Sequence, residues 1–278
     1  MSLRRSQINT GGDYRPKPPL LQSKSCLTAP GVWPIMPHAE QEKRPGTFLR
    51  SGINRTGEQM KIIALTDIHG HLDYLPQIAP QLASADLVLI AGDLTTFGGE
   101  AQAHRIVSSL EIHNPHILAV HGNCDRQAVE EYLHLGEIAL DGRCVTVNGV
   151  AFAGIGGSLS GSGTTPNESP ESEFASRLEE LKSQIDRDRP LVFVSHQPPW
   201  GTKLDAVGAD RHTGSKAIGD FILETQPICA LSGHIHEAAT TDTLRDTTLI
   251  NPGPFAHGRY AYIEIEDNTV KTAQLRSL

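Results

Sequence analysis

Five short apolar segments of this sequence are each followed, two or three positions after the last apolar residue, by a side chain that can bind a metal ion. These side chains and two near neighbours are, in chain order, Asp67, His69, Asp93, Asn123, His196, His234 and His236. Carboxylate, amide and imidazole ligands without a thiolate suit Mn²⁺, Fe or Zn²⁺. The set therefore predicts a site for such ions.

Each of these signals has an ordinary structural explanation when it is taken alone. An Asp at the end of a strand is commonly a turn former or a helix cap. Gly122-Asn123 suits a left-handed corner of the chain, and a single histidine such as His196 is commonly only hydrogen-bonded. Turn chemistry does not explain five such segments in one chain, and we interpret the ordered set as one site.

The apolar segments have the length and the branched residues of buried strands. They are IIAL (62–65), LVLI (87–90), ILAV (117–120), LVFV (191–194) and ICAL (228–231). Helical stripes are predicted around residues 106–110, 129–133 and 174–185, and hairpins at 143–155, 239–250 and 259–275. Strands that alternate with helices predict a layered α/β domain, and strand ends of such a sheet line the edge where ligands bind.

The ordered motifs resemble those of calcineurin-like metallophosphoesterases over residues 60 to about 255. They are DIH (67–69), GD (92–93), GNCD (122–125), SH (195–196) and GHIH (233–236). The resemblance implies an α/β fold, a four-layer α-β-β-α sandwich of two mixed β-sheets flanked by helices, with two metal ions. It implies one ion held by Asp67, His69, Asp93 and His236, and a second held by Asp93, Asn123, His196 and His234.

The chemistry implied by this family is the hydrolysis of phosphate esters. Two ions ~3.5–4 Å apart can hold a bridging hydroxide, which attacks phosphorus in line, and can clamp the phosphate oxygens. Asp93, as the bridge, and Asn123, as a neutral ligand, are the candidate catalytic residues of the centre. Two carboxylates against four metal charges leave a cavity that attracts anions.

Cys124 stands where the family usually has a histidine that contacts the substrate and can protonate the leaving oxygen. A thiol is a weaker hydrogen-bond donor than imidazolium, and general-acid help is worth ~10²–10⁴-fold. We therefore expect a small phosphodiester or an activated ester as substrate rather than an ordinary monoester. Asp125 is then expected to be a helix N-cap.

His212 is a candidate for the missing proton donor. The stretch around Gly214-Ser215 predicts the start of a helix, and a helix N-terminus can receive an anion. We hypothesise that His212 donates a proton to the substrate phosphate or binds it; the alternative is a surface histidine in a loop. Trp200 is either a wall of the substrate cleft or a core residue.

Charge is unevenly distributed, with a net charge of +5 in residues 1–59 and of −13 in residues 60–278. An acidic body repels polyphosphate backbones, so nucleic acid is not an expected partner. Two alternatives stay open: a catalytically silent binding scaffold, whose signature would be lost metal ligands, and a Mn²⁺-dependent nuclease. Four cysteines without C-x-x-C spacing predict thiols in a reducing cytoplasm, and no apolar run approaches the ~20 residues of a membrane span.

Residues 1–59 are expected to be a disordered extension, because they contain seven of the eighteen prolines and no periodic apolar pattern. Either an early start codon or an organelle-targeting function explains such a segment. The folded domain is expected at 60–278, with a mobile loop at 156–169. The apolar segment at 259–265 either pairs two subunits in a homo-oligomer or packs inside one.

Overall fold

All five apolar segments form strands in the computed structural model, which describes residues 59–161, 163–208 and 211–278. They are β1 (Met60–Leu65), β2 (Leu87–Ala91), β3 (Ile117–Val120), β8 (Leu191–Ser195) and β11 (Cys229–Leu231). Nearly every residue in them is buried. Burial on both faces explains why these strands are continuously apolar rather than alternating.

The strands belong to two mixed sheets. The first has the order β15-β14-β1-β2-β3, in which β1, β2 and β3 are parallel and β14 runs antiparallel to β1. The second has the order β12-β13-β11-β8-β5-β4, with a parallel centre and antiparallel outer strands. The added strands are β4 (Cys144–Val147), β5 (Val150–Ile155), β12 (Thr240–Leu244), β13 (Thr247–Asn251), β14 (Arg259–Glu266) and β15 (Thr269–Ser277).

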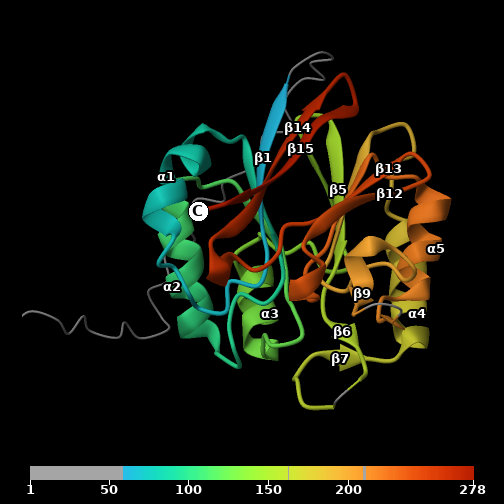
Figure 1. Ribbon diagram of the computed structural model, residues 1–278, viewed down its shortest axis with the longest axis horizontal. Helices are drawn as coiled ribbons and strands as arrows, with labels where there is room; N and C mark the ends of the chain where they lie inside the picture. Colours follow the sequence, from blue (N-terminus) through green and yellow to red (C-terminus); the bar gives the residue numbers. More distant parts are fainter. Residues whose placement is uncertain (1–58, 162, 209–210) are drawn as a thin grey trace, which may run out of the picture. The chain divides into compact units, whose positions relative to one another are not determined.

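Helices cover the outer face of each sheet (Figure 1). Three helices pack on the first sheet and two on the second. They are α1 (Leu75–Ser84), α2 (Glu100–Glu111), α3 (Gln127–Leu135), α4 (Glu171–Lys182) and α5 (Lys216–Thr225). Ile63 of β1 faces the helices while Ile62 faces the other sheet, as the two-residue period of a strand requires. The four-layer α-β-β-α sandwich is confirmed.

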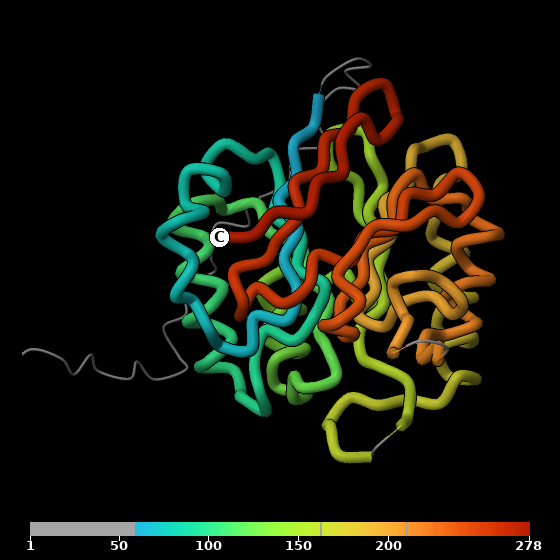
Figure 2. Tube along the Cα trace, viewed as in Figure 1, coloured from blue at the N-terminus to red at the C-terminus, as the bar shows by residue number. Residues whose placement is uncertain are grey.

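The two sheets pack face to face around a core that includes Ile62, Leu89, Phe152 and Val192. Strand β1 lies beside β14, the strand before the last, so that blue and red segments run together in Figure 2. Because β14 pairs with β1 on one side and β15 on the other, residues 259–265 are inside the sheet. Of the two readings of that segment, packing within one subunit is the right one.

The described residues also form two short two-stranded sheets. One pairs β6 (Ser158–Leu159) with β7 (Glu168–Ser169), and the other pairs β9 (Ala206–Val207) with β10 (Arg211–His212). The first of these short sheets lies inside the segment predicted to be a mobile loop, and the Glu168 carboxylate accepts the backbone N–H groups of Gly161, Gly163 and Thr165. The described residues of that segment, 156–161 and 163–169, are thus held by strand pairing and hydrogen bonds. The expectation for residues 1–58 lies outside the described residues. Within the described ranges, no helix combines the length and apolarity needed to cross a membrane.

The core between the sheets yields a stability prediction. Phe152 is fully buried, so Phe152→Ala should lower the free energy of unfolding by about 3–5 kcal/mol, because the side chain leaves a cavity. Equilibrium unfolding in urea measures this loss, provided that the slope of the free energy of unfolding against urea concentration is unchanged. Leu135→Ala is the control: Leu135 on α3 is 85% exposed, and its loss should stay within about 0.5 kcal/mol. Similar losses for the two variants would contradict the packing described for Phe152.

Candidate metal centre

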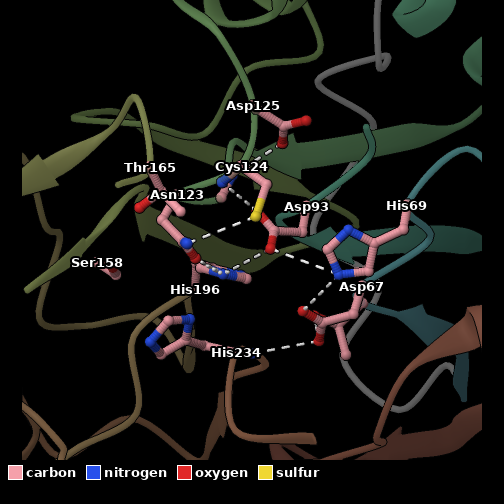
Figure 3. Close-up of polar contacts among 12 residues, drawn as sticks. Asp67, His69, Asp93, Asn123, Cys124, Asp125, Ser158, Thr165, His196 and His234 are labelled. Carbon is pink, nitrogen blue, oxygen red and sulfur yellow. Dashed lines mark hydrogen bonds and ion pairs between the residues drawn. The ribbon is translucent and has the colours of Figure 1, made fainter. Parts of the chain in front are cut away.

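The ends of strands from both sheets bring predicted ligands to one place, and Figure 3 shows the side chains of Asp67, His69, Asp93, Asn123, His196 and His234 gathered there. Donor atoms of Asp67, His69 and His236 lie within 4.8 Å of one another. His236 Nε2 is 3.1 Å from Asp67 Oδ1, and His69 Nε2 is 3.9 Å from the same oxygen. His69 Nε2 is also 3.7 Å from Asp93 Oδ2. This first group matches one predicted ligand set.

A second group adjoins the first through Asp93. Donor atoms of Asp67, Asp93 and His196 lie within 4.8 Å of one another. His196 Nε2 is 3.5 Å from Asp93 Oδ2 and 2.9 Å from Asn123 Oδ1. The His234 ring lies 5.1 Å from the His196 ring, centroid to centroid. Asp93 therefore lies next to both groups, in the position expected of a bridging ligand.

Hydrogen bonds outside the cluster orient two of its imidazole rings. His196 Nδ1 lies 2.8 Å from the carbonyl oxygen of Ala91, which can only accept, so this nitrogen carries the proton. His69 Nδ1 lies 3.1 Å from the hydroxyl of Thr96. In both rings Nε2 is thus the atom presented to the cluster, as is usual for metal-binding histidines.

The chemistry of the donors tests whether a cation fits. Asp67 Oδ1 is buried and accepts no hydrogen bond from any described residue, although His236 Nε2 is close to it. In its neutral form, His196 presents a lone pair at Nε2 to the carbonyl oxygen of Asn123. Acceptors that converge in this way repel one another unless a cation lies among them. The residues present therefore fit divalent ions.

The electrostatics of the cluster keep its carboxylates ionised. Burial raises the pKa of Asp93, but the charge and hydrogen bond of His196 outweigh burial and hold it well below its usual value. Burial opposes the charge of His196 as well, yet the neighbouring Asp93 raises the pKa of His196 to about 9. Burial, followed by repulsion from His196, lowers the pKa of His234 to about 4. Burial also lowers the pKa of His69. Ionised acids beside His69 and His234, whose lowered pKa values favour neutral imidazole, are a cation-binding combination.

Backbone strain concentrates at the same residues. Asp67, His69, Asp93 and His234 have φ angles of 50°, 49°, 49° and 68°, in the left-handed region. Non-glycine residues in sparsely populated regions cost of order 1–3 kcal/mol each and cluster at functional sites. Backbone hydrogen bonds hold this conformation: the N–H of His69 donates to the carbonyl of Asp93 at 2.9 Å.

The glycines that precede two ligands make room for other ligands. A Cβ on Gly92 would lie 2.4 Å from His196 Nδ1, and one on Gly122 would lie 2.0 Å from Asp93 Oδ1. Distances under about 3.0 Å force something to move. The Gly-Asp and Gly-Asn motifs are therefore interlocked, because each glycine admits a ligand from another strand end.

Asp125 has a different role from the predicted helix cap. The N-cap of α3 is Arg126, while the fully buried carboxylate of Asp125 accepts the N–H groups of Leu94, Thr95 and Gly122 at 3.0, 2.7 and 2.9 Å. Burial and then the Asp93 charge raise the pKa of Asp125 to about 6, against these hydrogen bonds. Asp125 ties the loop after β2 to the loop after β3, and so holds Asp93 and Asn123 in register.

Cys124 lies beside the cluster, and its backbone N–H donates to Asp93 Oδ1 at 2.8 Å. Burial, followed by the charge of Asp93, raises the pKa of the Cys124 thiol far above its usual value. Both effects favour the protonated thiol over the thiolate at this position.

His212 makes its contacts with residues other than the seven predicted ligands. It lies on β10, its Nδ1 is 2.7 Å from Asp205 Oδ1, and its ring is 5.9 Å from the Trp200 ring. Helix α5 begins as predicted, with Ser215 Oγ accepting the N–H of Ile218 at 3.2 Å. Its N-terminus is not available to an anion, however, because the carboxylate of Glu171 accepts the N–H of Ala217 at 2.7 Å.

Several residues that shape the site were not identified from the sequence alone. Thr96, the carbonyl of Ala91 and Asp205 contact predicted site residues, but nothing in their local sequence signals this. The segment 156–169 also reaches the centre: the N–H of Asn167 donates to the carbonyl of Asn123 at 3.1 Å.

Comparison with known proteins identifies the class. The calcineurin-like phosphoesterase family matches residues 60–238, and the chain belongs to this family. Members hydrolyse phosphoric esters with divalent metal ions. The uncharacterised protein MJ1162 of Methanocaldococcus jannaschii is 33% identical over 206 residues, which are 72% of this chain and 91% of that protein.

Two solved structures show the same fold at low sequence identity. TT1561 of Thermus thermophilus is 18% identical with a TM-score of 0.63, over 79% of this chain and 99% of that chain. GAP50, the anchor in the inner membrane complex of Plasmodium, is 14% identical with a TM-score of 0.52, over 79% of this chain and 84% of that chain.

The buried carboxylate of Asp125 gives a prediction about the centre. Asp125→Asn should lower the free energy of unfolding by roughly 2–4 kcal/mol, because an amide NH₂ would face backbone N–H donors. Affinity for Mn²⁺ should fall about 10–100-fold, since the loops that carry two ligands lose their tie. Urea unfolding and metal titration measure the two effects. Asp73→Asn is the control, since the side chain of Asp73 is 83% exposed; equal effects in both variants would contradict the tie.

Proposed function

We propose that this chain is a dinuclear metal-dependent phosphodiesterase that acts on a small substrate. The observation that carries the proposal is the convergence of donor side chains at the strand ends. Five of them form two adjoining groups with the Asp93 carboxylate between the groups, and Asn123 and His234 lie beside His196. Asp67, His69, Asp93 and His236 would hold one ion, and Asp93, Asn123, His196 and His234 the other. The donor set suits Mn²⁺, Fe or Zn²⁺.

Two ions bound there supply a hydroxide nucleophile at neutral pH and neutralise the charge of the phosphate oxygens. The protein residues set the conditions for this chemistry. Asp93 stays ionised because His196 lies beside it, and Asn123 contributes an oxygen without a negative charge that would repel the substrate. His69 and His196 present Nε2 because Thr96 and Ala91 hold their other nitrogen.

The preference for diesters rests on Cys124. Its thiol stays neutral because of burial and the Asp93 charge, which raise its pKa, and a thiol is a poor donor to a departing oxygen. Leaving groups that need little protonation, such as aryl oxygens, suit this centre best. His212 remains the predicted proton donor or phosphate ligand, acting from outside the metal cluster.

Charge and cysteine chemistry support the remaining parts of the proposal. A net charge of −13 in residues 60–278 disfavours a nucleic-acid polymer and hence a nuclease. The described cysteines Cys124, Cys144 and Cys229 are free thiols, which supports a reducing cytoplasm. A silent scaffold is disfavoured because all seven donors are present and brought together.

The first test compares Asp93→Ala with the unchanged full-length protein in the hydrolysis of bis-p-nitrophenyl phosphate with added Mn²⁺. Turnover in the variant should fall at least about 100-fold, because Asp93 contacts both ligand groups. Asp73→Ala, which changes an exposed carboxylate, is the control and should retain turnover. Two bound metal ions without turnover in the unchanged protein would support the scaffold instead.

His212→Gln tests the role of His212, because glutamine can hydrogen-bond but cannot give up a proton. Turnover of an alkyl phosphodiester should fall about 100-fold, whereas turnover of an aryl diester should fall less than about 10-fold. Steady-state rates on a matched pair of such esters measure the difference. Equal effects on the two esters would exclude proton donation by His212.

A further inference from the structure

An exposed indole, an imidazole and an ammonium group gather near the metal centre, on the side of the second sheet. Trp200 is 50% exposed, so it is not a core residue. Lys216 Nζ lies 5.1 Å from the centroid of its ring, and the His212 ring lies 5.9 Å from it. We call these three residues the Trp200 cluster.

A buried carboxylate holds the imidazole of this cluster. Asp205 is fully buried, and its Oδ1 lies 2.7 Å from His212 Nδ1. Its oxygens also accept the backbone N–H groups of Gly201, Thr202 and Gly214 at 3.1, 3.0 and 2.9 Å. With Nδ1 directed at Asp205, the ring presents Nε2 on its opposite side as a free donor or acceptor.

The cluster is fastened to the strand ends that carry two predicted metal ligands. Gln197, the residue after His196, is 1% exposed, and its side-chain N–H donates to the carbonyl oxygen of Thr213 at 2.8 Å. Strand β9, the partner of β10, packs against the short 3₁₀ helix His236–Ala238. The Trp200 cluster thus lies close to the centre along two connections.

The Trp200 cluster presents an exposed indole and an ammonium group side by side. The half-exposed indole leaves apolar surface in water. At the N-terminus of α5, the Glu171 carboxylate accepts the N–H of Ala217, so the ammonium group of Lys216, the first residue of the helix, takes no part in capping the helix. An indole face can stack on a planar ring, while an ammonium group and the Nε2–H of an imidazolium ring donate hydrogen bonds to anionic oxygens. A planar base joined to a phosphate combines both features.

We propose that the Trp200 cluster binds the nucleoside phosphate part of the substrate. The base stacks on Trp200, and phosphate or sugar oxygens contact His212 Nε2 and Lys216 Nζ. This inference rests on the proposed phosphodiesterase function for its reaction and names the substrate class as nucleotide esters. A single nucleotide unit is compatible with the acidic body, which repels a polymer.

The chain has two tryptophans, Trp33 and Trp200, so Trp33→Phe makes Trp200 the sole indole fluorophore. This protein, loaded with Mn²⁺, is titrated with AMP, adenosine and ribose 5-phosphate, with excitation at the red edge where adenine does not absorb. AMP should quench the emission saturably. Its apparent Kd should be at least about tenfold lower than those of the two fragments, which lack either the phosphate or the base. Absence of quenching, or equal binding of AMP and ribose 5-phosphate, would overturn the proposal.

Lysine variants provide a matched pair in the same background. Lys216→Ala should raise the apparent Kd for AMP roughly 5–10-fold because it removes a cation. Lys271→Ala, at an exposed position on β15, should leave it unchanged. Equal Kd values for the two variants would contradict a role for Lys216.

A second measurement uses two esters with the same leaving group. Trp200→Ala should lower kcat/KM for thymidine 5′-(p-nitrophenyl phosphate) about tenfold more than for methyl p-nitrophenyl phosphate, mainly through KM. Equal losses on both esters would contradict base stacking.

The turnover of bis-p-nitrophenyl phosphate, measured in the same samples, separates the two proposals. If this turnover is present and depends on Asp93 while AMP does not quench Trp200, the nucleotide inference fails and the phosphodiesterase stands. If AMP binds in a Lys216-dependent way but no ester is hydrolysed, the binding site stands and the phosphodiesterase fails.

Discussion

The closeness of two buried, ionised carboxylates, Asp67 and Asp93, is the constraint on which the rest of this structure depends. Their oxygens lie within 4.8 Å of each other and of His196, and both side chains are almost fully buried. Like charges in a low-dielectric environment repel strongly unless cations compensate them. The histidines compensate only in part, since burial keeps His69 and His234 largely neutral by lowering their pKa values. Divalent ions, which the family uses, would supply the remaining positive charge, so family membership and donor chemistry point to the same conclusion.

Such a cluster requires a rigid support, and the strand ends provide it. Left-handed backbone at four of the seven donors is unfavourable by itself. It persists because each donor follows a strand buried on both faces, and because backbone hydrogen bonds continue past the strand ends, as between Asp67 N–H and the Gly92 carbonyl at 3.1 Å. The contacts of Gly92 with His196 and of Gly122 with Asp93 leave no space for a different arrangement. Strain at the ligands is thus balanced by packing in the sheets.

The sequence predicted the strands and the order of the donors because both are local properties: apolar runs of strand length, and residue types just after them. It did not predict contacts that join distant residues. Asp125 accepts hydrogen bonds from Leu94 and Thr95, which only the fold brings close to it. Its position just before a helix suggested a helix cap instead. Residues 259–265 have the same apolar pattern in an edge strand and in a central one, so only the pairing with β1 distinguishes them. The sequence likewise did not predict the contact between Asp205 and His212.

The fold does not by itself decide between an enzyme and a scaffold, since a chain named as an anchor shares it. What distinguishes an enzyme from a scaffold is the site. Two electrostatic fields of opposite sign would act on a substrate there, over different distances. The net negative charge of residues 60–278 acts over the whole surface and repels a long polyanion. Bound ions act only within the centre, where two carboxylates do not neutralise them. A short, singly charged ester can reach the positive field of the ions while it meets little of the repulsion from the negatively charged surface. Under the proposed function, this difference in range would favour a small diester over a polymer, and a protonated thiol at Cys124 would leave protonation of the departing group to residues beyond the metal ligands.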